Sequence, residues 1–355
     1  MTNLNTIRES IATLPKGPPL VIAITGGTTG IGSYIAAAFA RAFSEHGHKL
    51  RIYIIGRSTS RAETVLEHGR ATSPGSDWRF IQAEDLSLMS DVERISKEII
   101  RQEENEPFAG GVPRLDALYM SQALSPLQPS KPTSESLDTQ LSLLYYSRIH
   151  FILTLLPLLL STPKPSHVIS VFAGGFEDRI SSTTLPIGTP LPENYNPTSV
   201  RTHVAFMKTF LFESLAEKYA GKISFVHIYP GLVDGPTFYS DVNPLWFRIL
   251  WRVMKPLIGW YMNSPEDCGS VMVSLATGRY PAKGVAMPGD ESGVIGGVAY
   301  STQRELGGGA YGVGQRGDEM KDVSYEKLRK EDTTQKVWEH TMGVLEGINR
   351  KSAIS

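Results

Sequence analysis

Short runs of consecutive apolar residues alternate along this chain with longer stretches in which apolar residues recur every three to four positions. The short runs are typical of strands buried on both faces of a parallel sheet, and the longer stretches are typical of helices with one buried face. The pattern predicts six strands, at residues 20–24, 50–55, 78–82, 115–120, 167–172 and 223–229. It predicts helices at residues 31–46, 61–69, 91–103, 137–160, 200–219 and 327–349.

The alternation of strands and helices predicts a fold class: α/β, with a single Rossmann-type domain built on a doubly wound parallel sheet. We expect the core at about residues 20–235, a substrate lid at about 236–264 and a C-terminal extension at about 280–355. Two long connections, 174–196 and 293–317, break the rhythm. Loops of this length are expected to be functional covers or mobile segments.

Composition and charge exclude several classes of function. Lys and Arg number 35 and Asp and Glu 36, so the net charge of -1 favours neither nucleic acid nor an anionic membrane as a partner. The longest apolar run, 151–160, is too short to span a bilayer, and residues 1–19 contain no apolar signal segment. The single cysteine, Cys268, cannot form an internal disulfide. We therefore expect a cytoplasmic protein without stable membrane insertion.

A glycine-rich motif, Thr-Gly-Gly-Thr-Thr-Gly-Ile-Gly at residues 25–32, lies between the first expected strand and the first expected helix. Glycines allow the backbone to approach a pyrophosphate closely, and a helix N-terminus offers free amides and the positive end of the helix dipole. A simple strand-to-helix turn is the alternative, but the buried strand before the motif and the Ala-rich helix after it favour a dinucleotide. The expected cofactor contacts are Gly26, Thr28, Thr29, Gly30, Ile31 and Gly32.

The end of the second strand indicates which dinucleotide binds. Gly56-Arg57 occupies the place of the acidic residue that would bind the ribose hydroxyl of NAD, and no acid follows until Glu63. Arg57 can pair with a 2′-phosphate, so NADP is favoured over NAD, with a solvated surface arginine as the alternative. Asp85 and Leu86, after the third strand, are expected to border the adenine, although Asp85 could also cap the next helix.

With these motifs in order, residues 20 to about 235 resemble the short-chain dehydrogenase/reductase family. Leu115-Asp-Ala-Leu118 is similar to the start of that family's fourth strand, and Pro230-Gly231-Leu-Val233 to its Pro-Gly turn. The resemblance implies that Pro230, Gly231 and Val233 lie beside the nicotinamide. It also implies that Ser121 and Gln122 face the nicotinamide ribose, unless they are structural caps. The tail, including residues 336–341, resembles a subgroup common in fungal secondary-metabolite gene clusters.

The family's catalytic tetrad of asparagine, serine, tyrosine and lysine is not matched. Counting back from Pro230 puts the tyrosine position within 197–200 and the lysine position within 201–204, where no such pair occurs. The serine position falls at Val171 or Phe172, with Ser170 as the nearest hydroxyl. The asparagine position falls at Leu144 or Tyr145, and the fourth strand ends in Met120-Ser-Gln-Ala123 in place of the family's Asn-Asn-Ala-Gly.

Loss of one acid-base group alone costs about 10²–10⁴ in rate, so loss of the whole tetrad should leave little of the family's usual redox activity. Three interpretations of the function therefore remain open. In order of preference they are non-redox chemistry of the isomerase, dehydratase or cyclase type, an NADPH-dependent reductase with displaced acid-base residues, and a catalytically silent NADP-binding module. Tyr145, Tyr195 and His203 are the candidate catalytic residues. Tyr146, Arg148, Glu177 and Asp178 are further polar groups, each with a plain structural alternative: core tyrosines, a surface arginine and a solvated loop.

The segment 243–262 carries five aromatic residues beside Arg248, Arg252 and Lys255. In the family this insertion point is the substrate lid, and an aromatic lid favours a large hydrophobic small-molecule substrate. A helix lying on a membrane surface is the competing interpretation. The resemblance also implies a possible homo-oligomer; the sequence determines neither the oligomeric state nor the substrate.

Overall fold

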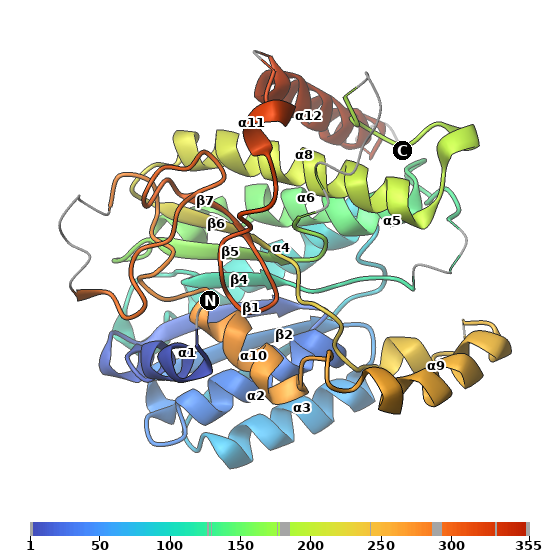
Figure 1. Ribbon diagram of the computed structural model, residues 1–355. Coiled ribbons are helices and arrows are strands. Elements are labelled where there is room, and N and C mark those ends of the chain that lie inside the picture. Colours follow the sequence, from blue (N-terminus) through green and yellow to red (C-terminus); the bar gives the residue numbers. More distant parts are fainter. Residues whose placement is uncertain are drawn as a thin grey trace.

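A seven-stranded parallel sheet forms the centre of the protein in the computed structural model (Figure 1). The structure describes residues 3–125, 128, 130–175, 177, 185–241, 243–285, 293–330 and 332–352. The strands are β1 Leu20–Thr25, β2 Leu50–Gly56, β3 Asp77–Gln82, β4 Ala117–Met120, β5 Ser166–Val171, β6 Ile223–Ile228 and β7 Ala310–Val313. Their order, β3-β2-β1-β4-β5-β6-β7, reverses between β1 and β4 and confirms the doubly wound Rossmann-type fold.

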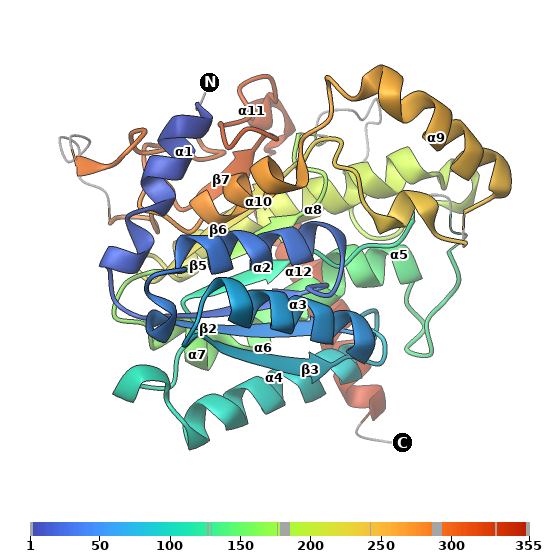
Figure 2. The same ribbon diagram turned by 90° about the horizontal axis from the view of Figure 1, so that it is seen from below.

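Helices cover both faces of this sheet, so each face has its own apolar core (Figures 1 and 2). On one face lie α1 Leu4–Ile11, α2 Gly30–Ala42, α3 Thr59–Thr72 and α10 Pro265–Ser274. On the other face lie α4 Met89–Asn105, α6 Ser147–Thr154 and α8 Pro197–Lys218. The C-terminal helix α12, Thr333–Ser352, lies outside α8 and forms an additional layer.

The long helix expected at 137–160 is interrupted. It consists of α5 Thr139–Leu141, a π-helical turn at Ser142–Tyr146, α6, and α7 Leu156–Leu160. The break lies at Leu155, because Pro157 has no N–H to donate to a carbonyl one turn earlier. The π-helical turn faces the carboxyl edge of the sheet and contains Leu144, Tyr145 and Tyr146.

Other differences from the expected elements arise at caps and in the C-terminal part. Helix α8 begins at Pro197 because Asn196 and Ser199 form a reciprocal capping box. Strand β7 lies within a stretch expected to be a glycine-rich loop, and it pairs with β6. The expected helix at 327–349 is the short α11, Tyr325–Leu328, followed by α12. Within the described part of the chain, no helix is both long and apolar enough to cross a bilayer.

Candidate active site

A cavity of about 330 Å³ lies at the carboxyl ends of β1, β2 and β4, where the strand order reverses. This first pocket is the place where open α/β sheets bind nucleotides. Ten of the residues expected to contact a dinucleotide line it: Gly26, Thr28, Thr29, Gly30, Ile31, Arg57, Asp85, Leu86, Ser121 and Gln122. Gly32, Pro230, Gly231 and Val233 are not part of its lining.

The glycine loop has the geometry of a phosphate cradle. Gly26 has a φ of 72°, a conformation that favours glycine, and a Cβ on Gly32 would lie 2.3 Å from the carbonyl oxygen of Gly26. Gly32 therefore lets helix and loop pack closely. Thr29 begins helix α2 without a side-chain cap, so the first amides and the positive dipole end face the pocket.

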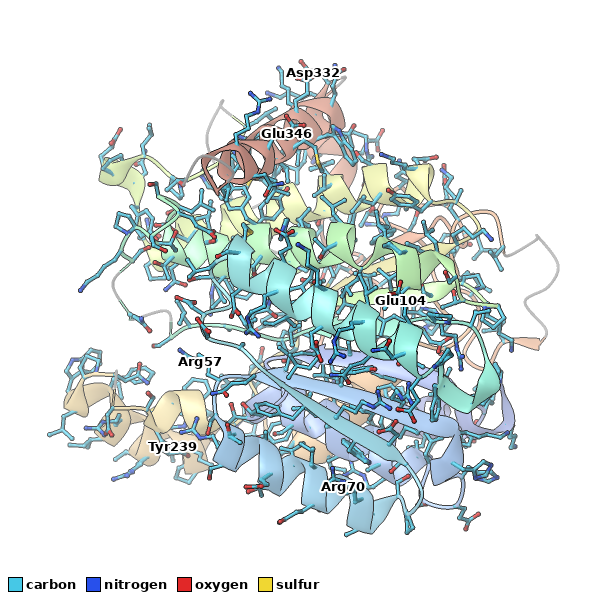
Figure 3. The ribbon with its side chains drawn as sticks, turned by 180° about the vertical axis from the view of Figure 1, so that it is seen from behind. Arg57, Arg70, Glu104, Tyr239, Asp332 and Glu346 are labelled. Atoms are coloured by element: carbon cyan, nitrogen blue, oxygen red, sulfur yellow. The ribbon has the colours of Figure 1, made fainter. Side chains whose placement is uncertain are left out.

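Two arginines border the first pocket after β2. Arg57 lines it as expected, and Ser58 and Arg61 join it there (Figure 3 labels Arg57). The Ser58 side chain accepts a hydrogen bond from the Arg61 backbone N–H at 3.3 Å, which begins helix α3 at this point. Arg61 follows Arg57 by four residues, in the first turn of a helix that Ser58 caps. This spacing is the signal by which Arg61 could have been found in the sequence.

Three polar residues of this lining use their side chains within the protein. Asp85 Oδ1 accepts hydrogen bonds from the backbone N–H and hydroxyl of Ser87, at 2.9 and 2.7 Å, and so closes a turn before α4. Ser121 donates to the carbonyl oxygen of Thr25 at 2.9 Å. Gln122 is buried, with its side chain 2.5 Å from the Thr25 hydroxyl. The structural alternative therefore holds for Ser121 and Gln122 alongside their place in the lining, whereas Asp85 does not cap α4, whose N-cap is Leu88.

A second pocket of about 310 Å³ adjoins the first, and Leu124 and Gln128 line both. Its wall includes Leu144, Phe172 and Val200. These residues stand at or beside the positions of the asparagine, the serine and the tyrosine in the family's tetrad. The wall is therefore apolar at the positions of the asparagine, serine and tyrosine, whereas the window of the lysine position, 201–204, includes Arg201. The polar groups of the wall are Gln128, Ser130, Gln140, Tyr195, Asn196 and Arg201.

Tyr195 is the one sequence-derived catalytic candidate in this second pocket. Its hydroxyl donates to Asp138 Oδ2 at 2.9 Å, and the Ser130 hydroxyl donates to the same oxygen at 2.6 Å. Partial burial and the hydrogen bond to Asp138 raise the pKa of Tyr195 to about 12. The phenol is therefore protonated at neutral pH and connected to a carboxylate, an arrangement that can deliver or relay a proton.

Tyr145 and His203 do not line either pocket. The Tyr145 hydroxyl is 2.7 Å from the Thr341 hydroxyl of α12, and complete burial raises the pKa of this tyrosine. The His203 Nδ1 atom is 2.8 Å from the carbonyl oxygen of Gly188. Tyr146 is also directed to α12, where its hydroxyl lies 2.8 Å from His340 Nε2. The contacts of Tyr145 and Tyr146 could not be found in the sequence, because their partners on α12 lie 196 and 194 residues further along the chain.

Beneath Phe172 lie two buried basic side chains: Arg148, which the sequence offered as a further polar group, and Lys208, which it did not. Arg148, for which a surface position was one alternative, is fully buried and donates to the Ser170 hydroxyl and to the carbonyls of Val171 and Gln122. Lys208 is also fully buried, and its Nζ has no hydrogen-bond partner among the residues that the structure describes. Burial, together with the charge of Arg148, lowers the pKa of Lys208 well below its ordinary value.

Glu177 is the carboxylate of this buried layer. It is fully buried, which makes the solvated loop expected there wrong for Glu177, and Asp178 lies outside the described residues. Its Oε1 accepts from the Thr209 hydroxyl at 2.8 Å and its Oε2 from the Gly175 N–H at 2.7 Å. His227 Nδ1 is 3.8 Å from Oε1, and burial holds the pKa of His227 well below its ordinary value.

The Pro-Gly turn after β6 is shaped by contacts from other segments. Gly231 has a φ of 75°, and a Cβ there would meet Gln315 Oε1 at 2.0 Å. Asn263 donates through Nδ2 to the carbonyl of Pro230 at 2.9 Å. The turn leads to Asp234, whose backbone carbonyl accepts from the Tyr34 hydroxyl of α2 at 2.9 Å. The chain therefore passes close to the glycine loop before it reaches the expected lid.

The expected lid contains helix α9, Leu245–Ile258, and its aromatic side chains do not line the second pocket. Trp246 and Trp260 are 61% and 87% exposed. The helix is held instead by Trp251, which stacks on Phe238 at 3.9 Å, and by the ion pair of Lys255 with Asp234 at 2.6 Å. These contacts turn the other face of α9 to solvent, away from the body of the protein (Figures 1 and 2).

Together, the sheet order and the glycine cradle define a Rossmann-type α/β protein with its candidate site at the topological switch point. No family model matches the chain. The chain is 50% identical over 354 residues to the short-chain dehydrogenase/reductase SAT2 of Stachybotrys chartarum, covering 99% of each protein. It is 31% identical over 352 residues to an oxidoreductase of Emericella nidulans, covering 98% of each.

These relatives establish the identity that the sequence motifs suggested: the chain belongs to the short-chain dehydrogenase/reductase family. Solved structures agree on the fold. An L-sorbose reductase of Gluconobacter frateurii, in complex with NADPH and L-sorbose, superposes with a TM-score of 0.52 at 20% identity, over 74% of this chain and 91% of that one. RhlG of Pseudomonas aeruginosa, in complex with NADP, gives 0.51 at 20% identity, over 73% and 90%.

Proposed function

We propose that the first pocket binds NADP(H). The observation that carries this proposal is the pair Arg57 and Arg61 at the end of β2, where NAD-binding proteins carry an acid. The glycine cradle and the uncapped start of α2 would hold the pyrophosphate, and the two guanidiniums would pair with the 2′-phosphate. The solved neighbours that hold NADP or NADPH support the assignment. Titration with NADPH and NADH tests it, and equal affinities would overturn it.

The second pocket is proposed to hold the substrate, a small molecule with an apolar body. Its wall of Leu124, Leu144, Phe172 and Val200 excludes water beside the place that the cofactor would occupy. A cavity of about 310 Å³ is at the lower end of the usual range for ligand pockets, about 300–1,000 Å³. This volume, together with an α9 that does not cover the pocket, favours a smaller substrate than the aromatic segment suggested.

The reaction that we propose is a non-redox rearrangement of this substrate, of the isomerase, dehydratase or cyclase type. When bound, NADP(H) could supply a hydride, but the apolar side chains at the asparagine, serine and tyrosine positions leave no polarising serine beside it. The Tyr195–Asp138–Ser130 chain can instead carry a proton from one substrate atom to another. Turnover by the purified protein of the compound that accumulates when its gene is deleted, with NADPH absorbance followed, tests this reaction class.

A specific observation keeps a reductase as the second candidate. The Tyr195 hydroxyl lines the pocket next to the cofactor cavity, so it could replace the missing tyrosine as proton donor. Several fungal relatives carry the name oxidoreductase, which is consistent with this alternative. One mole of NADPH oxidised per mole of product would favour it.

In either case we propose that the protein works in the cytoplasm, which fractionation of the cells would test.

A further inference from the structure

Arg201 is an unpaired cation in the wall of the second pocket. It lies in the second turn of α8, half-buried, and its guanidinium makes no hydrogen bond or ion pair with any residue that the structure describes. The guanidinium lies over the ring of Phe172, with 5.9 Å between Arg201 Cζ and the ring centroid. A guanidinium beside apolar side chains gains most from a planar oxyanion, to which it can donate two parallel hydrogen bonds.

The buried layer behind the pocket adds positive charge. Arg148 Cζ and Lys208 Nζ lie 5.9 and 5.5 Å from the same Phe172 ring, and neither residue is part of the pocket lining. The hydrogen bonds of Arg148 go to neutral acceptors. Glu177, the acid of this layer, is engaged by Thr209 and by the N–H of Gly175. Because its hydrogen bonds go to neutral acceptors, Arg148 brings a guanidinium behind the pocket without an acid among its hydrogen-bond partners.

The acid that is hydrogen-bonded to the pocket wall has its acceptor atoms occupied by donors of the protein. Asp138 accepts hydrogen bonds from the Tyr195 hydroxyl at 2.9 Å, the Ser130 hydroxyl at 2.6 Å and the Leu141 N–H at 2.9 Å. Three donors therefore compensate this carboxylate, and it is not itself part of the lining. The described lining of the second pocket contains one charged side chain, Arg201.

We propose that the substrate of this enzyme is a carboxylic acid, with its carboxylate bound by Arg201 and its apolar body against Leu144, Phe172 and Val200. The inference rests on the proposed function only in taking the second pocket as the substrate site. Arg201 fixes one end of the molecule, and Tyr195, on the same wall, reaches a different part of it. Arg201 is thus a specificity-determining residue that orients the substrate toward the cofactor side of the cavity.

The test compares two probes that differ only in charge, 2-naphthoate and methyl 2-naphthoate. Calorimetric titration of the full-length protein should show the carboxylate binding roughly tenfold to a hundredfold more tightly than the ester. Arg201→Gln should remove this preference and leave the affinity for the ester unchanged. Arg57→Gln is the matched control, because it removes an arginine from the other pocket and should leave the preference for naphthoate intact.

Equal affinities for the two probes in the unmodified protein would overturn the proposal, and so would a preference that survives Arg201→Gln. Failure of both probes to bind at millimolar concentration would also contradict it, since the cavity would then not accept an aromatic acid. NADPH titration of the same three proteins reports separately on the first pocket. Absence of NADPH binding by the unmodified protein, with an intact naphthoate preference, would refute the proposed cofactor and leave the carboxylate site standing.

Discussion

At the scale of single residues, Arg57 is the residue that we propose decides the cofactor. Arg57→Asp places an acid where NAD-binding proteins carry one and repels a 2′-phosphate, so the affinity for NADPH should fall at least about tenfold. The affinity for NADH should stay level or rise. Fluorescence titration with both nucleotides measures the change. Arg41→Asp, the same substitution at an exposed site on α2, is the control and should alter neither affinity.

Tyr195 is the residue on which the proposed chemistry depends. Tyr195→Phe removes the hydroxyl that donates to Asp138 and faces the substrate pocket, so kcat should fall by about 10²–10⁴. Steady-state turnover of the natural substrate measures this loss. Tyr219→Phe, at the far end of α8, should leave kcat within a factor of two or three. A Tyr195→Phe enzyme with full activity would mean that another group moves the proton.

Among the site residues, those in continuous motifs could be predicted and those brought together by folding could not. The glycine loop and Arg57 are read directly, because strand, turn and helix follow each other within a few residues. Tyr145 and His203 looked equivalent to Tyr195, since nothing local reveals that Thr341 and Gly188 engage the first two. The burial of Arg148 and Lys208 could not be predicted for the same reason.

At the scale of elements, α12 packs on the outer side of α8 and covers it. Val337, Leu345 and Ile348 are buried there, and Thr341 and His340 engage the two tyrosines of the π-helical turn. An amphipathic helix at the C-terminus could be predicted from its periodicity. Its docking position could not, because the sequence does not say which apolar faces meet.

Leu345→Ala tests this docking. Removal of a buried leucine side chain should lower the free energy of unfolding by about 2–4 kcal/mol. Urea denaturation followed by circular dichroism measures it. The neighbouring Glu346→Ala removes only an exposed pair with Arg350 and should cost less than about 1 kcal/mol. Equal and small effects of both substitutions would show that α12 is not packed on α8.

At the scale of the whole molecule, two apolar cores flank one sheet, and their tyrosines link stability to pH. Burial raises the pKa of Tyr53, Tyr119, Tyr145, Tyr280 and Tyr311. Groups whose folded pKa lies above the unfolded value of about 10 stabilise the protein fully below that pH and lose this contribution as pH rises through the folded pKa.

The free energy of unfolding should therefore decrease between about pH 10 and pH 12, the value near which the pKa of Tyr280 lies. Urea denaturation at fixed ionic strength across this range measures the decrease. The tyrosinate absorbance of these five buried side chains should rise together with unfolding and not before it. Ionisation of most tyrosines near pH 10 in the folded protein would contradict the burial of these side chains.

The central claim concerns the whole assembly of cofactor pocket, apolar substrate pocket and proton-carrying Tyr195. The most direct test is turnover of the natural substrate with NADPH that carries deuterium at the transferable position of the nicotinamide. We expect product to form with no deuterium in it and no change in NADPH absorbance, because the asparagine, serine and tyrosine positions in the pocket wall are apolar. Deuterium in the product, with stoichiometric oxidation of NADPH, would contradict the account and establish a reductase.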